Sequence, residues 1–144
     1  MFKLTLLATT ILLCLVSLSC QNYSAGLEKS VARADETTAL GALHTVAVAQ
    51  QTYSISNGGN YGTFPQLCAG GYLDSRFNSD KPPIKDYVLT MEVGSSAQGP
   101  LYKINADPAG NGPQGRHFYT DSTSSAPHVN PTQPASANDP IVQP

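Results

Sequence analysis

Residues 30–56 read SVARADETTALGALHTVAVAQQTYSIS, and this stretch decides the fold. Its apolar side chains recur at steps of three, four or seven residues, the spacing that places them on one face of a helix. Alanine is frequent, proline is absent, and two acidic residues fall early, where the helix dipole favours them. The pattern predicts one long amphipathic helix whose apolar face comprises Val31, Ala34, Ala39, Leu43, Val46, Ala47 and Tyr53.

This helix is predicted to end at Ser56, because the next four residues are Asn-Gly-Gly-Asn. Both residue types accept the left-handed backbone conformation that commonly closes a helix. A short second helix is expected over residues 64–69, where Thr63 is a suitable N-cap, Pro65 suits the first turn and two glycines follow. Leu73 and Phe77 are expected to pack against the long helix.

Three short strands are predicted at residues 85–93, 101–106 and 116–121. In the first, alternate residues are apolar, as in a strand with one buried face. Glycine-rich turns join the three strands, so we expect an antiparallel meander. Its apolar face would cover the long helix, which gives an α+β fold for residues 30–121.

The C-terminal stretch, residues 122–144, holds five prolines among Ser, Thr, Asn and Ala. It has almost no apolar residue before Ile141, so its sequence predicts a disordered tail that contributes nothing to the fold. A solvated spacer is the simpler interpretation, and a proline-rich recognition peptide is the alternative.

Residues 1–20, MFKLTLLATTILLCLVSLSC, have one early lysine, an apolar run from residue 4 to 16 and small residues before Cys20. This is the layout of an export signal. Ordinary cleavage at Ser17-x-Ser19 is one route. The other is a bacterial lipobox ending in Leu18-Ser19-Cys20, which would make Cys20 the lipidation site; its leucine lies one residue closer to the cysteine than usual. Residues 21–29 would then be a polar tether.

The cysteines leave two alternatives. If Cys20 carries lipid, Cys68 is unpaired, and a small buried apolar side chain is the expected role. If Cys20 is free, a disulfide between Cys20 and Cys68 becomes available in an oxidising compartment. The three histidines are far apart and lack paired cysteines, so we predict no metal site and no cofactor.

The amino-acid composition restricts the classes of binding partner that this chain is expected to have. Charged residues make up 12% of the chain, against roughly 25% in soluble domains. The net charge of −2 and the lack of a basic cluster argue against nucleic acid as a partner. We expect the membrane as a partner instead, through an N-terminal lipid or apolar segment.

Catalytic signatures are missing from the sequence: it has no nucleophile motif and no phosphate-binding glycine loop. Asp107, His117 and Asp121 could form an acid–base group, but Asp-Pro is commonly a turn and His117 fits an ordinary strand position. We therefore expect a protein that is not an enzyme. A small-ligand site built from tyrosines is a further alternative, using Tyr61, Tyr72, Tyr87, Tyr102 and Tyr119.

The ordered set of segments resembles bacterial type IV pilins and type II secretion pseudopilins. Residues 32–53 look like the exposed half of the family's first helix. Residues 70–74, the strand with Tyr87, residues 102–108 and residues 116–121 are similar to pilin-like head domains. The resemblance covers about residues 30–121 and implies a pilin-like structural or interaction protein of the bacterial cell envelope, with envelope, pilus or secretion proteins as partners.

The N-terminus departs from the family pattern. Family members have a glycine before the prepilin peptidase cleavage site, a phenylalanine after it and a glutamate shortly beyond. Here Phe2 follows Met1 directly, and the first acidic residue is Glu28. We expect a pilin-like head whose stem is replaced by an export signal, exported and lipid-anchored at the periplasmic or cell surface, or secreted. A minor pilin or pseudopilin that keeps residues 2–20 as its stem is the alternative.

Overall fold

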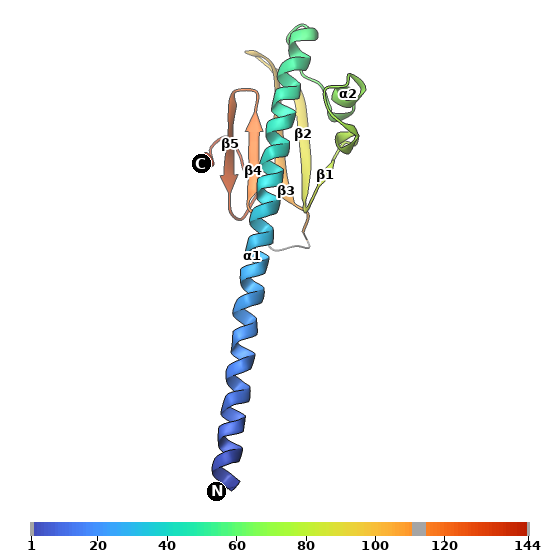
Figure 1. Ribbon diagram of the computed structural model, residues 1–144. Helices are drawn as coiled ribbons and strands as arrows, with labels where there is room; N and C mark the ends of the chain where they lie inside the picture. Colours follow the sequence, from blue (N-terminus) through green and yellow to red (C-terminus); the bar gives the residue numbers. More distant parts are fainter. Residues whose placement is uncertain (1, 111–114, 144) are drawn as a thin grey trace.

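The computed structural model describes residues 2–110 and 115–143, and for residues 2–23, 25 and 125 it describes the backbone alone. It contains one long helix and one antiparallel sheet (Figure 1). Helix α1 (Phe2–Ser56) has 55 residues, and the sheet lies beside its C-terminal part only. The fold is therefore α+β, as the sequence predicts.

Helix α1 ends at Ser56 as expected. Gly58 and Gly59 follow with φ of 63° and 86°, and the Gly59 amide donates to the Ser54 carbonyl oxygen at 2.8 Å. The helix starts earlier than residue 30, since residues 21–29, predicted to be a polar tether, are helical. Those residues contain no proline and one glycine, so nothing in them stops a helix that continues on both sides.

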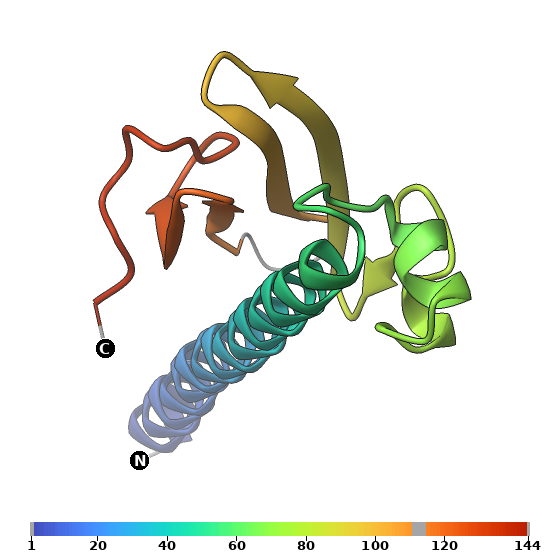
Figure 2. The ribbon, with the colours of Figure 1, turned by 90° about the horizontal axis from the view of Figure 1, so that it is seen from above.

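Two short helices follow α1. Helix α2 (Phe64–Ala69) begins where predicted, and the Thr63 amide donates to the Gln66 side chain at 2.8 Å. The 3₁₀ helix η1 (Ser75–Phe77) comes next. Figure 2 shows α2 on one side of α1, with β4 and β5 on the other.

The sheet has five strands rather than the predicted three, in the order of the sequence. They are β1 (Pro83–Ile84), β2 (Tyr87–Ser96), β3 (Gly99–Pro108), β4 (His117–Asp121) and β5 (Ser124–Asn130). Strands β2 and β3 pair along their whole length, whereas β4 pairs with residues 103–106 of β3 only. The three predicted strands correspond to β2, β3 and β4, and the sequence missed β1 and β5.

The core lies between α1 and one face of the sheet. Leu43 and Val46 of α1 are buried, as predicted, against apolar residues of the strands and of the segment that contains α2 and η1. Val31 does not belong to it, because 50% of its surface is exposed. The described side chains of α1 first become buried at Asp35, and we call α1 from Asp35 onward, with all later residues, the head. The strand and connecting residues in this core are Phe64, Leu67, Leu73, Phe77, Ile84, Tyr87, Leu89, Tyr102, Ile104, Ala106 and Phe118.

The C-terminal segment is ordered by contacts with the sheet, which corrects the prediction of a disordered tail. Asn105 alternates with the buried Ile104 and Ala106, so it lies on the sheet face away from α1, where its amide donates to the Ala135 carbonyl oxygen at 2.8 Å. Ala135 is 4% exposed. An isolated bridge between His128 and Ile141 also protects part of the β5 edge.

Candidate functional site

The predicted lipidation site, Cys20, falls where the structure describes the backbone but no side chain. Cys68 is a half-buried free thiol that packs against the core and donates to the Asp74 carbonyl oxygen at 3.3 Å. Burial raises the pKa of the Cys68 thiol, and the Asp74 charge raises it further. A protonated, inward-packed thiol of this kind is a poor nucleophile.

Two of the three residues of the candidate acid–base group do meet. His117 Nδ1 and Asp107 Oδ1 lie 2.6 Å apart across β4 and β3. Asp121 lies apart from them at the other end of β4, where its carboxylate accepts hydrogen bonds from Tyr119 and from Thr123. The triad expected from the sequence is therefore a pair, and the third carboxylate caps the β4–β5 turn instead.

The five candidate tyrosines do not form one site. Tyr61 and Tyr102 meet edge to face, with ring centroids 4.8 Å apart. Tyr87 is buried beside Phe118, and Tyr119 contacts the His128 ring. Tyr72 packs instead on Tyr53 of α1, with ring centroids 5.4 Å apart.

Tyr61 and Tyr102 line a groove of about 340 Å³ between α1 and the β4–β5 turn. Burial, together with the neighbouring Tyr61 and Asp121, raises the pKa of Tyr102 to about 12. Its lining mixes apolar side chains with hydroxyl and amide groups. Its other lining residues are His44, Ala47, Val48, Gln51, Ser54, Asp121, Ser122, Thr123 and Ser124.

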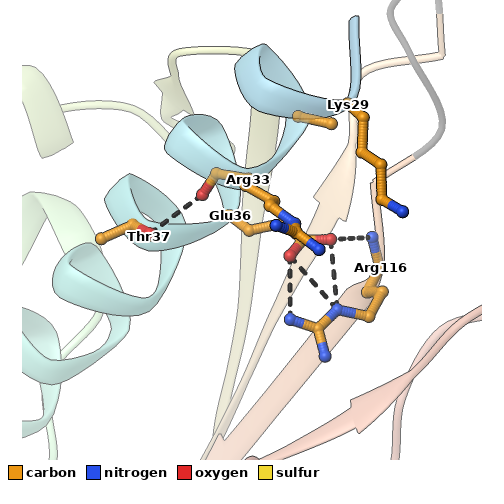
Figure 3. A pocket seen from close by; sticks show the side chains of 6 residues that line it. Lys29, Arg33, Glu36, Thr37 and Arg116 are labelled. Carbon is orange, nitrogen blue, oxygen red and sulfur yellow. Dashed lines mark hydrogen bonds and ion pairs between the residues drawn. The ribbon is translucent and has the colours of Figure 1, made fainter. Parts of the chain in front are cut away.

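A second concave site lies at the end of the head nearer the N-terminal half of α1, and we call it the basal pocket (Figure 3). It has a volume of about 580 Å³. Three cationic side chains surround one carboxylate there, two from α1 and one from the residue before β4 (Figure 3). The lining residues are Lys29, Ala32, Arg33, Glu36, Thr37 and Arg116.

An ion pair between Glu36 and Arg116 closes one side of the basal pocket. Arg116 Nη2 donates to Glu36 Oε2 at 2.8 Å, and Arg116 Nε lies 3.2 Å from both carboxylate oxygens. The Arg116 backbone amide adds a fourth contact, to Oε1 at 3.0 Å. The Glu36 side chain is 12% exposed, whereas that of Arg116 is 47% exposed.

The electrostatics of Glu36 follow from these contacts. Burial acts to raise the pKa of Glu36, but hydrogen bonds from the Arg116 side chain and amide, with the charges of Arg116 and Arg33, hold that pKa below its ordinary value. Glu36 is therefore ionised at neutral pH, and its charge is balanced by Arg116.

Sequence reasoning missed the basal pocket because its two halves are 80 residues apart. In the sequence, Glu36 indicated only that a helix begins nearby, and Arg116 indicated only the start of a strand. The one usable signal was the spacing of Lys29 and Arg33, which puts both cations on one face of a helix.

Comparison with protein-family models, with characterised proteins and with solved structures finds no match to this chain. Among the described side chains, no three or more His, Cys, Asp or Glu residues are placed to hold a metal ion. Within that same part of the chain, no helix is long and apolar enough to cross a membrane.

Proposed function

We propose that this chain is a noncatalytic, pilin-like structural or interaction protein of the bacterial cell envelope. Its N-terminal segment holds it at a membrane, and its head presents the contact surface. The observation that carries this proposal is the division of α1 into two parts. The helix is continuous from Phe2 to Ser56, yet the sheet covers only its C-terminal part (Figure 1).

The uncovered part of α1 includes the apolar run at residues 4–16. A helix of apolar sequence beside which no other described element lies is stable next to lipid or next to another apolar helix, not in water. This supports a chain that is directed to a membrane. If the run is retained, it attaches the protein there; if it is an export signal that is removed, attachment requires the lipid at Cys20.

A lipid anchor at Cys20 is the form of attachment we favour. The residues Leu18-Ser19-Cys20 support it, and the helical backbone after Cys20 supplies a stiff spacer. Between Cys20 and Asp35 the helix rises about 22 Å, at about 1.5 Å per residue. The spacer would keep most of the head away from the membrane, where other envelope proteins can reach it, and leave the end nearer Cys20 closest to the lipid.

One observation favours a second candidate, a minor pilin or pseudopilin subunit. Residues 2–20 continue the same helix that packs in the head, without a break at Cys20. If these residues are retained, they provide an apolar stem of the kind that pilin-like subunits use in filaments.

Substitution of Cys20 tests the anchor. Cells expressing Cys20→Ser should release the protein from the membrane pellet to the soluble fraction, because two acyl chains contribute about 0.8 kcal/mol per buried methylene and suffice for stable anchoring. Cys68→Ser is the matched control and should stay in the pellet. The intact mass of each purified protein shows whether the N-terminus was processed and lipidated.

The two candidates give opposite results. A Cys20→Ser protein that is correctly processed but remains in the pellet would defeat the lipoprotein proposal. A wild-type mass that includes residues 2–20 and no lipid would support the filament subunit instead.

A further inference from the structure

The described residues that line the basal pocket carry more positive than negative charge. Lys29, Arg33 and Arg116 contribute three positive charges, and Glu36 contributes the single negative charge among the lining residues. Among the described residues that line the pocket, Arg116 and Glu36 form the one ion pair. Among the described residues, neither Lys29 nor Arg33 forms an ion pair.

The pocket also has more hydrogen-bond donors than its one carboxylate can accept. Glu36 occupies Nε and one hydrogen of Nη2 on Arg116, so the remaining hydrogens of that guanidinium have no carboxylate partner. Lys29 and Arg33 are exposed, and Figure 3 shows their side chains on the same side of α1 as Arg116. Guanidinium groups match the oxygens of planar and tetrahedral anions through paired N–H donors.

We propose that the basal pocket binds a doubly charged oxyanion of the phosphate type. A net charge of +2 at the lining residues is balanced by two negative charges, whereas a single carboxylate balances half of it. The Glu36–Arg116 pair fixes one guanidinium in place, so less side-chain freedom is lost when the anion binds. The two exposed cations on α1 complete the ligand shell.

The phosphate group can come from solution or from a phosphomonoester headgroup such as that of phosphatidic acid, which can carry two negative charges. The basal pocket lies at the end of the head that points toward the N-terminal half of α1. The headgroup source rests on the proposed membrane attachment, because only then does that end of the head face lipid. Binding of free phosphate requires no such attachment.

Titration with inorganic phosphate tests the pocket. The full chain, purified in a neutral detergent, is titrated at constant ionic strength while the backbone amide of Arg116 is followed by NMR. That amide donates to Glu36 and reports on the pocket directly. We expect a saturable shift in the wild type, and at least a tenfold higher dissociation constant in the double variant Lys29→Ala/Arg33→Ala.

The matched control is Lys81→Ala/Lys103→Ala, which removes the same charge from exposed positions outside the pocket. It should bind phosphate like the wild type. General effects of phosphate on protein stability act on all three proteins alike and so do not mimic this difference. A response that never saturates, or equal affinities in the two double variants, would overturn the proposal.

A second titration identifies whether the phosphate group comes from solution or from a lipid headgroup. Phosphatidic acid in the micelles replaces free phosphate, and binding through Lys29 and Arg33 there but not in solution assigns the site to a headgroup. Binding of free phosphate alone assigns it to a soluble anion. If neither binds but a glutamate-rich peptide does, the proposal is wrong and the pocket contacts an acidic protein. None of these results depends on the fractionation of Cys20→Ser, so failure here leaves the membrane proposal standing.

Discussion

The polar residue Gln50 fixes the segment between α1 and α2 to the helix. Its side chain is fully buried, yet its amide makes a pair of hydrogen bonds with Gly62. Nε2 donates to the Gly62 carbonyl oxygen at 2.6 Å, and the Gly62 amide donates to Oε1 at 2.9 Å. A Cβ at Gly62 would lie 3.1 Å from the Tyr53 ring, so this close approach favours glycine.

Gln50→Leu should destabilise the protein by about 2–4 kcal/mol, because it leaves the buried amide and carbonyl of Gly62 without partners. Gln51→Leu is the control: its side chain is exposed, and the change should stay within about 0.5 kcal/mol. Urea unfolding followed by circular dichroism measures both. Equal, small effects would mean that water can replace the Gln50 amide.

At the scale of elements, the C-terminal segment completes the sheet. In β5, Val129 pairs with Phe118 and packs against the core, although Pro127 interrupts the strand sequence. The proline is tolerated because its backbone faces the outer edge, where its carbonyl accepts from the Val142 amide at 2.8 Å. Asp139 then closes the following loop by accepting from Asn130 and Ser136.

Deletion of residues 131–144 should therefore lower the melting temperature by at least about 4 °C, since the loss of about 1 kcal/mol has that effect in a domain of this size. It removes the hydrogen bonds to Asn105, Pro127 and Val129. Deletion of residues 143–144 alone is the control and should leave the melting temperature unchanged. A shift below 1 °C for the longer deletion would show that the segment is a spacer after all.

At the scale of the whole molecule, the Glu36–Arg116 pair joins α1 to the chain that enters β4. The pKa of Glu36 is lowered in the folded state, so its stabilising contribution is complete above its ordinary value of 4.5. As the pH falls below that value, the unfolded state takes up the proton first. The contribution is lost by the time the pH has passed the lowered pKa of the folded state.

We expect the difference in unfolding free energy between wild type and Glu36→Gln to be largest near pH 7 and to shrink as the pH drops from 5 to 3. Urea titrations at several pH values measure it. Glu28→Gln is the matched control, because Glu28 is exposed on the same helix before the head, and it should follow the wild type throughout. A difference that stays constant with pH would mean that the Glu36 charge contributes nothing.

The sequence by itself determined the features that depend on local signals. The end of α1 at Ser56, helix α2 and strands β2 to β4 were all predicted from periodicity, caps and glycine-rich turns. These signals act within a few residues, so neighbouring side chains suffice to identify them. The same signals placed Leu43 and Val46 in the core.

Other features of the fold and the candidate site depend on contacts that form only in the tertiary structure. Strand β5 looked disordered because proline and small polar residues give it no pattern of its own, and its order comes from β4 beside it. Val31 fits the apolar face but is exposed, because the head covers α1 only from Asp35 onward. The Glu36–Arg116 pair and the basal pocket arise from residues 80 positions apart, which meet only when the sheet packs on the helix. Contacts between distant residues leave no local signal, and in this protein they define the candidate site.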